Sequence, residues 1–171
     1  MIERNIDCRK HRKSTHIASA DLDSMELENK KLIFTIEDAR YETGVDVSGN
    51  KTDGYFVKFK GHKKEMVLNS VNRKTLADLA KIKGFEGAER YNIGNWIGFT
   101  IELFVDRKVK MMAKIVDGIR VRPAFPILEK PELTPEHKRW EDAKKAVKAG
   151  KLESVTSKYK LSEENLILIQ A

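Results

Sequence analysis

The sequence predicts a mainly β fold with added helices, because two hydrophobic periods follow each other along the chain. Between residues 31 and 122, apolar residues occupy every second position in several short segments, which is the pattern of half-buried strands. One stretch among them, 72–84, instead has apolar residues at helical spacing. After the proline-containing stretch that begins at Pro126, the spacing is again helical, so we expect a small helical appendage behind the β domain.

Three strands are expected first, over 31–42, 54–61 and 65–69. Leu32, Phe34 and Ile36 share one face of the first strand. The second strand alternates between an inner and an outer set, Tyr55, Val57 and Phe59 against Phe56, Lys58 and Lys60. The short gap "HKK" predicts a hairpin over 54–69, whereas the glycines of "TGVDVSGNKTDG" predict a loop over 43–54.

A helix is expected next, over 72–84, with Asn72 as its N-cap and Gly84 as its stop. A fourth strand follows over 95–111, where only Arg107 breaks the alternation, and Gly98 suits a bend near its start.

The fifth strand is expected over Ile115–Arg122. The turn before it falls at Asp106–Lys108 or at Met112–Lys114, and periodicity does not choose between them.

Three strands, a helix and two more strands is the order of the OB fold, a small, partly open five-stranded barrel. We therefore assign 31–125 to an OB-like barrel and 1–30 to a flexible basic arm, with at most one helical turn near "SADLDSMEL". Prolines mark 126–134 as a linker, and 135–171 form the helical appendage.

In this appendage, Thr134 caps a helix with Pro135 at its first position, and Ser162 begins the last helix.

The composition favours a polyanionic partner. Of the 171 residues, 35% are charged, and 33 lysines and arginines against 26 acidic residues give a formal net charge of +7. Cys8 is the only cysteine, so no intrachain disulfide can form. No segment approaches 18 continuous apolar residues and the N-terminus has no secretory pattern, so we expect a cytoplasmic protein without membrane contact.

The expected binding surface is the outer face of the barrel. In "DGIRVRP" at 117–123, Ile119 and Val121 face one way and both arginines the other. OB domains bind single strands through a basic groove and aromatic rings on which bases stack. The predicted nucleic-acid-binding residues are Phe56, Lys58, Lys60, Lys63, Lys64, Phe104, Lys108, Lys110, Arg120 and Arg122, with Tyr55 or Tyr91 as further rings. The alternative is an ordinary solvated face with its aromatic rings buried under the appendage.

The sequence offers little support for a metal site or an enzyme. Cys8, His11 and His16 have the spacing of metal ligands, but a structural zinc site needs a fourth ligand, and no later motif supplies one. There is no P-loop, no GxGxxG motif and no GxSxG motif, and the acidic residues are scattered. We therefore expect no cofactor and no catalysis.

Five stretches, "ASADL", "KLIFTIEDA", "EMVLNSVNRKTLADL", "NWIGFTIELF" and "DGIRVRP", together resemble a family of small phage and prophage proteins over residues 15–125. The resemblance implies an OB-type protein of phage DNA replication or recombination that binds single-stranded DNA. It also favours the hairpin turn at Met112–Lys114, where relatives tend to have glycine. Relatives carry lysine after "WIG", where this chain has Phe99.

The sequence therefore predicts an accessory protein that binds single-stranded DNA without sequence preference. Phage or host replication proteins are possible further partners, through the C-terminal helices. Their last segment, "SEENLILIQ", is acidic and apolar, which does not suit a recognition helix in the major groove. The alternative function is a protein-interaction or structural module of phage origin with no role in nucleic-acid binding.

Overall fold

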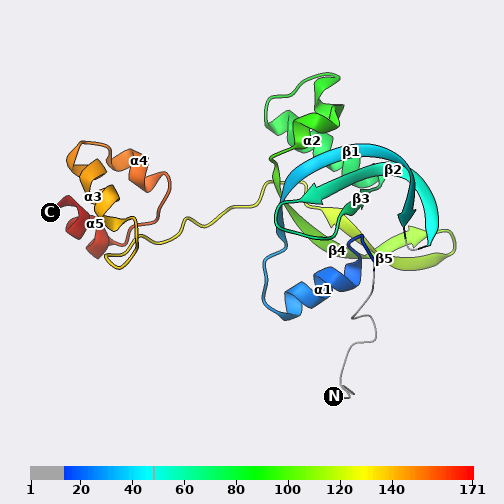
Figure 1. The fold of residues 1–171 in the computed structure, drawn as a ribbon, viewed down its shortest axis with the longest axis horizontal. Coiled ribbons are helices and arrows are strands. Elements are labelled where there is room, and N and C mark those ends of the chain that lie inside the picture. The colour runs from blue at the N-terminus through cyan, green and yellow to red at the C-terminus, as the bar shows by residue number, and fades with distance from the viewer. Residues whose placement is uncertain (1–13, 48) are drawn as a thin grey trace, which may run out of the picture. The chain divides into compact units, whose positions relative to one another are not determined.

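The computed structural model describes residues 14–47 and 49–171, which belong to two compact units that divide after Pro126 (Figure 1). The first unit contains all five strands, and the second contains three helices. Residues 1–13, with Cys8 and His11, lie outside the described residues, as does position 48.

The first unit is built on one antiparallel sheet in the strand order β3-β2-β1-β4-β5. Its strands are β1 (Ile33–Val47), β2 (Asn50–Phe59), β3 (Met66–Leu68), β4 (Thr100–Met111) and β5 (Lys114–Val121). The sheet curves strongly along β1 and β2 (Figure 1). Among the described residues, β3 and β5 do not pair with each other, so the sheet is open rather than a closed barrel.

The β1–β2 hairpin is longer than the sequence predicts, and the loop expected over 43–54 is wrong. Both strands continue through this segment, with Val45 opposite Thr52 and Val47 opposite Asn50. The Gly44 amide donates to the Asp53 carboxylate at 2.7 Å. Glycine and aspartate therefore stabilise irregular points within the strands here, although their composition is typical of a loop.

The edge of β5 is closed by a side chain of α2 (Ser70–Ile82). Asn72 is fully buried, donates to the Ile119 carbonyl at 3.0 Å and accepts from the Val121 amide at 3.1 Å. Its amide group thereby satisfies two edge groups of β5. The prediction that Asn72 caps α2 is wrong by three residues, because Asn69 is the N-cap and accepts from the Asn72 amide.

The edge of β3 is extended by the N-terminal segment. Ile17 donates to the Glu65 carbonyl at 2.7 Å, and Glu65 donates to the Thr15 carbonyl at 3.0 Å. The helix α1 (Ser19–Leu27) follows and buries Leu22 in the core. Residues 14–30 are thus part of the fold and not of a flexible arm, since their backbone and apolar side chains have specific partners.

The β4–β5 hairpin turns at Met112 and Ala113, the second of the two positions that the sequence allowed. The register shifts between Asp106 and Val109, around Arg107, which is where the alternation breaks. Gly118 lies opposite this bulge, and a Cβ there would lie 2.8 Å from Val109.

The core lies between the sheet, α2 and α1. Two short 3-10 helices, η1 (Glu89–Tyr91) and η2 (Ile93–Trp96), complete its wall. The largest side chains that are fully buried in this core are Leu22, Phe34, Ile36, Phe59, Met66, Leu76, Leu79, Trp96, Ile101 and Leu103. Those of β1, β2 and β4 follow the predicted alternation, whereas Met111, at the end of the predicted alternation in β4, is 61% exposed.

The second unit consists of α3 (Trp140–Lys148), α4 (Leu152–Thr156) and α5 (Glu163–Gln170) around its own small core. Leu133, within the stretch expected to be a linker, is fully buried in this core. The expected start of α3 at Pro135 is wrong, because turns occupy 135–139 and the helix begins at Trp140. Ser162 caps α5 as predicted, by accepting from the Asn165 amide.

Within the described part of the chain, no helix combines the length and the apolar character that crossing a bilayer requires.

Candidate nucleic-acid interface

Arg120 of β5 and Arg122, which directly follows this strand, lie opposite β4, and each faces a carboxylate of β4. Arg122 Nε lies 2.7 Å from Glu102 Oε1. Arg120 Nε lies 3.7 Å from Asp106 Oδ2. The Arg122 guanidinium also lies 4.9 Å from the centroid of the half-buried Phe104 ring. Both arginines therefore have partners within their own sheet, and a phosphate would have to compete with these ion pairs.

Phe56 is completely buried, so the prediction that it is an exposed stacking platform is wrong. Its ring is 0% exposed and lies outside the main core cluster. The His16 ring packs on it with 5.5 Å between centroids, and the Arg40 guanidinium lies 5.8 Å from its centroid. The cover thus includes the N-terminal segment paired with Glu65.

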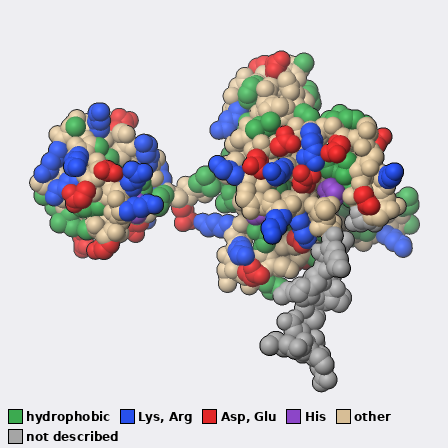
Figure 2. All heavy atoms as spheres, in the orientation of Figure 1, with side chains coloured by type: hydrophobic (Ala, Val, Ile, Leu, Met, Phe, Trp, Pro, Cys, Tyr) green, Lys and Arg blue, Asp and Glu red, His purple; other side chains and the backbone are tan. Residues whose placement is uncertain are grey.

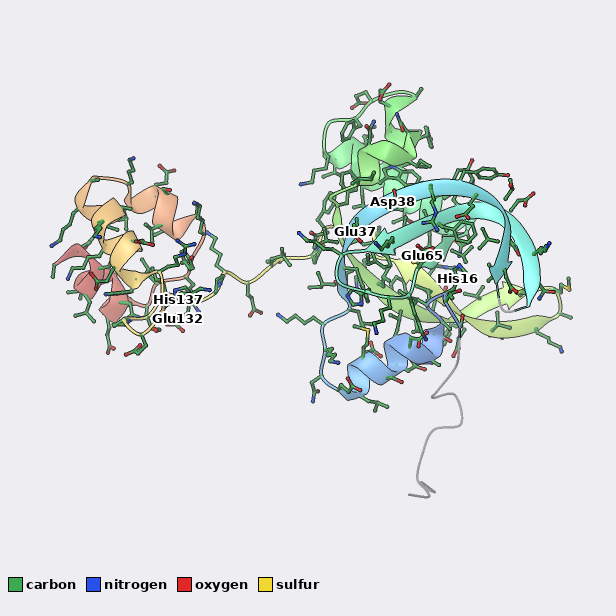
Figure 3. The ribbon with its side chains drawn as sticks, in the orientation of Figure 1. His16, Glu37, Asp38, Glu65, Glu132 and His137 are labelled. Atoms are coloured by element: carbon green, nitrogen blue, oxygen red, sulfur yellow. The ribbon has the colours of Figure 1, made fainter. Side chains whose placement is uncertain are left out.

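Carboxylates gather on the same side of β1 and β2 (Figure 3). Glu37, Asp38 and Glu65 lie over these strands, with His16 close to Glu65. Lys58 Nζ lies 2.9 Å from Glu37 Oε2, and this hydrogen bond raises the pKa of Lys58. The predicted phosphate ligand Lys58 is therefore already ion-paired with Glu37 of the neighbouring strand.

Arg40 is surrounded by acidic side chains in this cluster. Its guanidinium lies 2.7 Å from Glu65, 2.8 Å from Glu42 and 3.5 Å from Asp38. Hydrogen bonds to Glu65 and Glu42 raise the pKa of Arg40 above its ordinary value. Carboxylates outnumber cations here, so this face is a poor surface for a polyanion.

The lysines of the β2–β3 connection divide into two groups. Lys64 Nζ lies 2.5 Å from Asp21 Oδ1 and is half-buried. Lys60 and Lys63 are exposed and form no ion pair with any residue that the structure describes. They are free to contact a phosphate, but they are only two.

The end of the β4–β5 hairpin concentrates exposed cations. Lys108, Lys110 and Lys114 are exposed, and none forms an ion pair within the described parts of the chain. The hairpin base is fixed by Arg107, which bonds to Asp23 of α1 at 2.8 Å, a contact that raises the pKa of Arg107. Three free lysines thus project from an anchored two-stranded ribbon.

Exposed apolar side chains lie among these lysines (Figure 2). Met112 at the turn is 100% exposed, and Met111 and Ile115 are 61% and 69% exposed. Lys110 lies opposite Ile115, and Met111 lies opposite Lys114. Since opposite residues share a face, each face of the ribbon presents a lysine beside an apolar side chain.

The hairpin includes two residues that the sequence prediction missed, Met112 and Lys114. Met112 has φ of 55°, in the left-handed region that non-glycine residues rarely adopt. The signal that identifies both is the turn at Met112, because it places Lys114 opposite Met111 at the exposed end of the hairpin.

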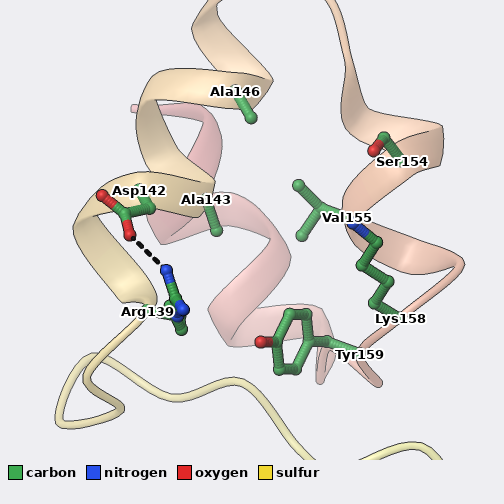
Figure 4. Close-up of a pocket in the computed structure, with 8 residues that line it drawn as sticks. All are labelled: Arg139, Asp142, Ala143, Ala146, Ser154, Val155, Lys158 and Tyr159. Atoms are coloured by element: carbon green, nitrogen blue, oxygen red, sulfur yellow. Dashed lines mark hydrogen bonds and ion pairs between the residues drawn. The ribbon is translucent and has the colours of Figure 1, made fainter.

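The second unit has a pocket of about 360 Å³ between α3 and α4 (Figure 4). Ala143, Ala146 and Val155 form its apolar part. Arg139 and Asp142 line it as an ion pair at 3.2 Å. This unit is therefore a separate candidate binding surface.

Of the three residues with metal-ligand spacing, Cys8, His11 and His16, only His16 lies within the described residues, and its ring packs on Phe56. No group of three or more histidine, cysteine or acidic side chains in the described ranges has the arrangement of a metal site.

The chain matches no protein-family model, and no curated protein or solved structure is significantly similar to it. The resemblance to phage proteins therefore stays a prediction.

Proposed function

We propose that this protein binds single-stranded DNA without sequence preference, and that the β4–β5 hairpin makes the main contact. The observation that carries the proposal is a set of three exposed lysines around an apolar tip, none of which forms an ion pair with a described residue. Phosphates attract the lysines, and unpaired bases offer apolar faces to Met112 and Ile115. A single strand presents both chemistries together, whereas a duplex hides the faces of its bases.

The sheet supports this proposal at the level of strand order. The order β3-β2-β1-β4-β5, with α2 between β3 and β4, is compatible with an opened OB-like barrel. In OB folds, the connection between the fourth and fifth strands is one of the loops that bind oligonucleotides. A role in phage replication or recombination is part of the proposal and rests on the sequence resemblance.

Fluorescence anisotropy with labelled oligo-dT of about 30 nucleotides, against a duplex of equal length, tests the proposal. The parent should prefer the single strand. Replacing Lys108, Lys110 and Lys114 by glutamine should weaken binding about tenfold to 100-fold at 0.1 M salt, since three phosphate contacts are lost.

The matched control replaces three lysines of α3, Lys144, Lys145 and Lys148, by glutamine. It changes the net charge equally and should leave affinity within about twofold, since binding depends on location and not on total charge. Equal losses in both variants would mean that attraction is generic and would contradict the hairpin site.

A second candidate function, favoured by the surface of α5, is binding of a protein partner by the second unit. Ile167 and Leu168 are 70% and 49% exposed on a helix whose first turn is acidic. Such a surface suits a partner with apolar and basic side chains. Crosslinking in an extract of the source cells, compared between the parent and Ile167→Asn/Leu168→Asn, tests it. A partner captured equally by both would count against α5.

A further inference from the structure

A pocket of about 280 Å³ lies beside α2, and none of the predicted basic site residues lines it. It is formed by side chains of β2, α2, η1 and η2: Tyr55, Ser70, Arg73, Lys74, Tyr91, Ile93 and Trp96. Its size is at the small end for ligand sites in proteins, so it suits a small group and not an extended chain.

Aromatic rings form much of this pocket. Tyr91 is 55% exposed, with the Arg90 guanidinium 4.6 Å from the centroid of its ring on one face, and Tyr55 is half-buried. Trp96 is buried and fixed, because its indole Nε1 donates to the Arg90 carbonyl at 2.9 Å. The pocket therefore combines a rigid wall with an accessible ring on which a flat aromatic group can stack.

Two cations complete the lining. The Arg73 guanidinium lies 4.4 Å from the centroid of the Tyr55 ring, so its plane is held at the pocket. Arg73 Nε is buried and has no hydrogen-bond partner among the described residues. Lys74 is exposed and forms no ion pair with a described residue. An arginine held beside such a lysine is suited to an anionic oxygen, above all to a phosphate.

The charge of this pocket distinguishes it from three others in the protein. The pockets at Arg139, Asp117 and Asp23 each include a carboxylate. No acidic side chain among the described residues lines the pocket at Arg73. The pocket is thus both aromatic and purely cationic.

We propose that this pocket binds one nucleotide unit, with the base against the tyrosine rings and the phosphate on Arg73 and Lys74. The idea rests on the proposed function for its ligand class, nucleic acid, but not on the β4–β5 hairpin. The same chemistry is present in a nucleotide within a strand, in a 5′-phosphorylated end and in a free nucleotide. The test has to distinguish these three sources.

The indole N–H signals of the two tryptophans give a local readout, since Trp96 lines the pocket and Trp140 belongs to the second unit. The 15N-labelled full chain is titrated with thymidine 5′-monophosphate, thymidine or inorganic phosphate. The nucleotide should shift the Trp96 signal saturably and leave Trp140 unchanged. Thymidine and phosphate should each bind at least tenfold more weakly.

Arg73→Gln and Tyr91→Leu should each weaken the nucleotide response about tenfold. Lys81→Gln is the matched control, since Lys81 is an exposed lysine of α2 that does not line the pocket. A Trp96 signal that no nucleotide shifts, or a shift that survives in both pocket variants, would overturn the proposal.

Oligo-dT with and without a 5′-phosphate identifies the source. A response to both supports a nucleotide within the strand, a response to the phosphorylated oligomer alone supports a strand end, and a response to the monophosphate alone supports a free nucleotide. Binding of oligo-dT in the anisotropy assay with no Trp96 response to any of these probes overturns the pocket and leaves the hairpin function intact. A Trp96 response to the monophosphate without any binding of oligo-dT in the anisotropy assay supports the pocket and contradicts the hairpin function.

Discussion

Replacing Asn72 by alanine should destabilise the first unit far more than loss of a helix cap. The Asn72 side chain is fully buried and makes two hydrogen bonds, at 3.0 Å to the Ile119 carbonyl and 3.1 Å to the Val121 amide. The substitution leaves the Val121 amide without its partner and the Ile119 carbonyl with only Arg120 Nη1, at 3.3 Å. Each lost hydrogen bond to a buried group costs about 1–3 kcal/mol. We therefore expect a loss of about 3 kcal/mol in the free energy of unfolding.

The comparison is Asn69→Ala, which removes the observed N-cap of α2 and should cost about 1 kcal/mol. Urea denaturation followed by Trp96 fluorescence measures both, in a Trp140→Phe background so that only the first unit reports. The two costs should differ by about 2 kcal/mol. If Asn72→Ala costs no more than Asn69→Ala, the bridge between α2 and β5 does not stabilise the fold as argued.

Three further predictions concern single residues. Phe56→Ala should cost about 3–5 kcal/mol of stability, because the ring is fully buried, and an unchanged urea midpoint would show that the ring is exposed after all. Met112→Gly should raise the stability by up to about 1 kcal/mol, because glycine adopts the left-handed conformation without strain, and a lowered melting temperature would contradict this. Hydrogen bonds from its own backbone amide and from the Thr134 hydroxyl lower the pKa of Glu136. This carboxylate therefore stabilises the second unit above the unfolded-state pKa of about 4.3. The contribution is lost as the pH falls through the lowered pKa of the folded state. Carbon-detected NMR titration should show the low midpoint in the parent and a higher one in Thr134→Val; a parent midpoint at the ordinary glutamate value would contradict it.

Periodicity predicted most of the sheet but not where its side chains find partners. Val57 and Phe59 enter the core, and Phe56 points the other way, as the alternation of β2 requires. The burial of Phe56 could not be predicted because part of its cover, His16, lies 40 residues earlier in the chain and is held near β2 by pairing with Glu65. Local pattern carries no information about such a long-range contact.

The candidate site was predicted only in part, because its ion pairs also depend on contacts that a local pattern does not show. Lys108 and Lys110 are exposed on the hairpin as expected, whereas Arg120 and Arg122 face carboxylates of β4. Those ion pairs depend on the strand register, which is fixed by the turn at Met112 and by the bulge at Arg107. The sequence alone left two positions open for that turn, and so left open which charges would be paired.

The salt dependence of oligo-dT binding tests the central claim, that lysines of the β4–β5 hairpin contact phosphates. Each phosphate contact to a single strand contributes about 0.7 to the negative slope of log K against log salt. The slope should therefore become shallower by about 2 when Lys108, Lys110 and Lys114 are all replaced by glutamine, and should not change in the α3 control. An unchanged slope in the hairpin variant, with affinity retained, would mean that phosphates bind elsewhere and would contradict the account.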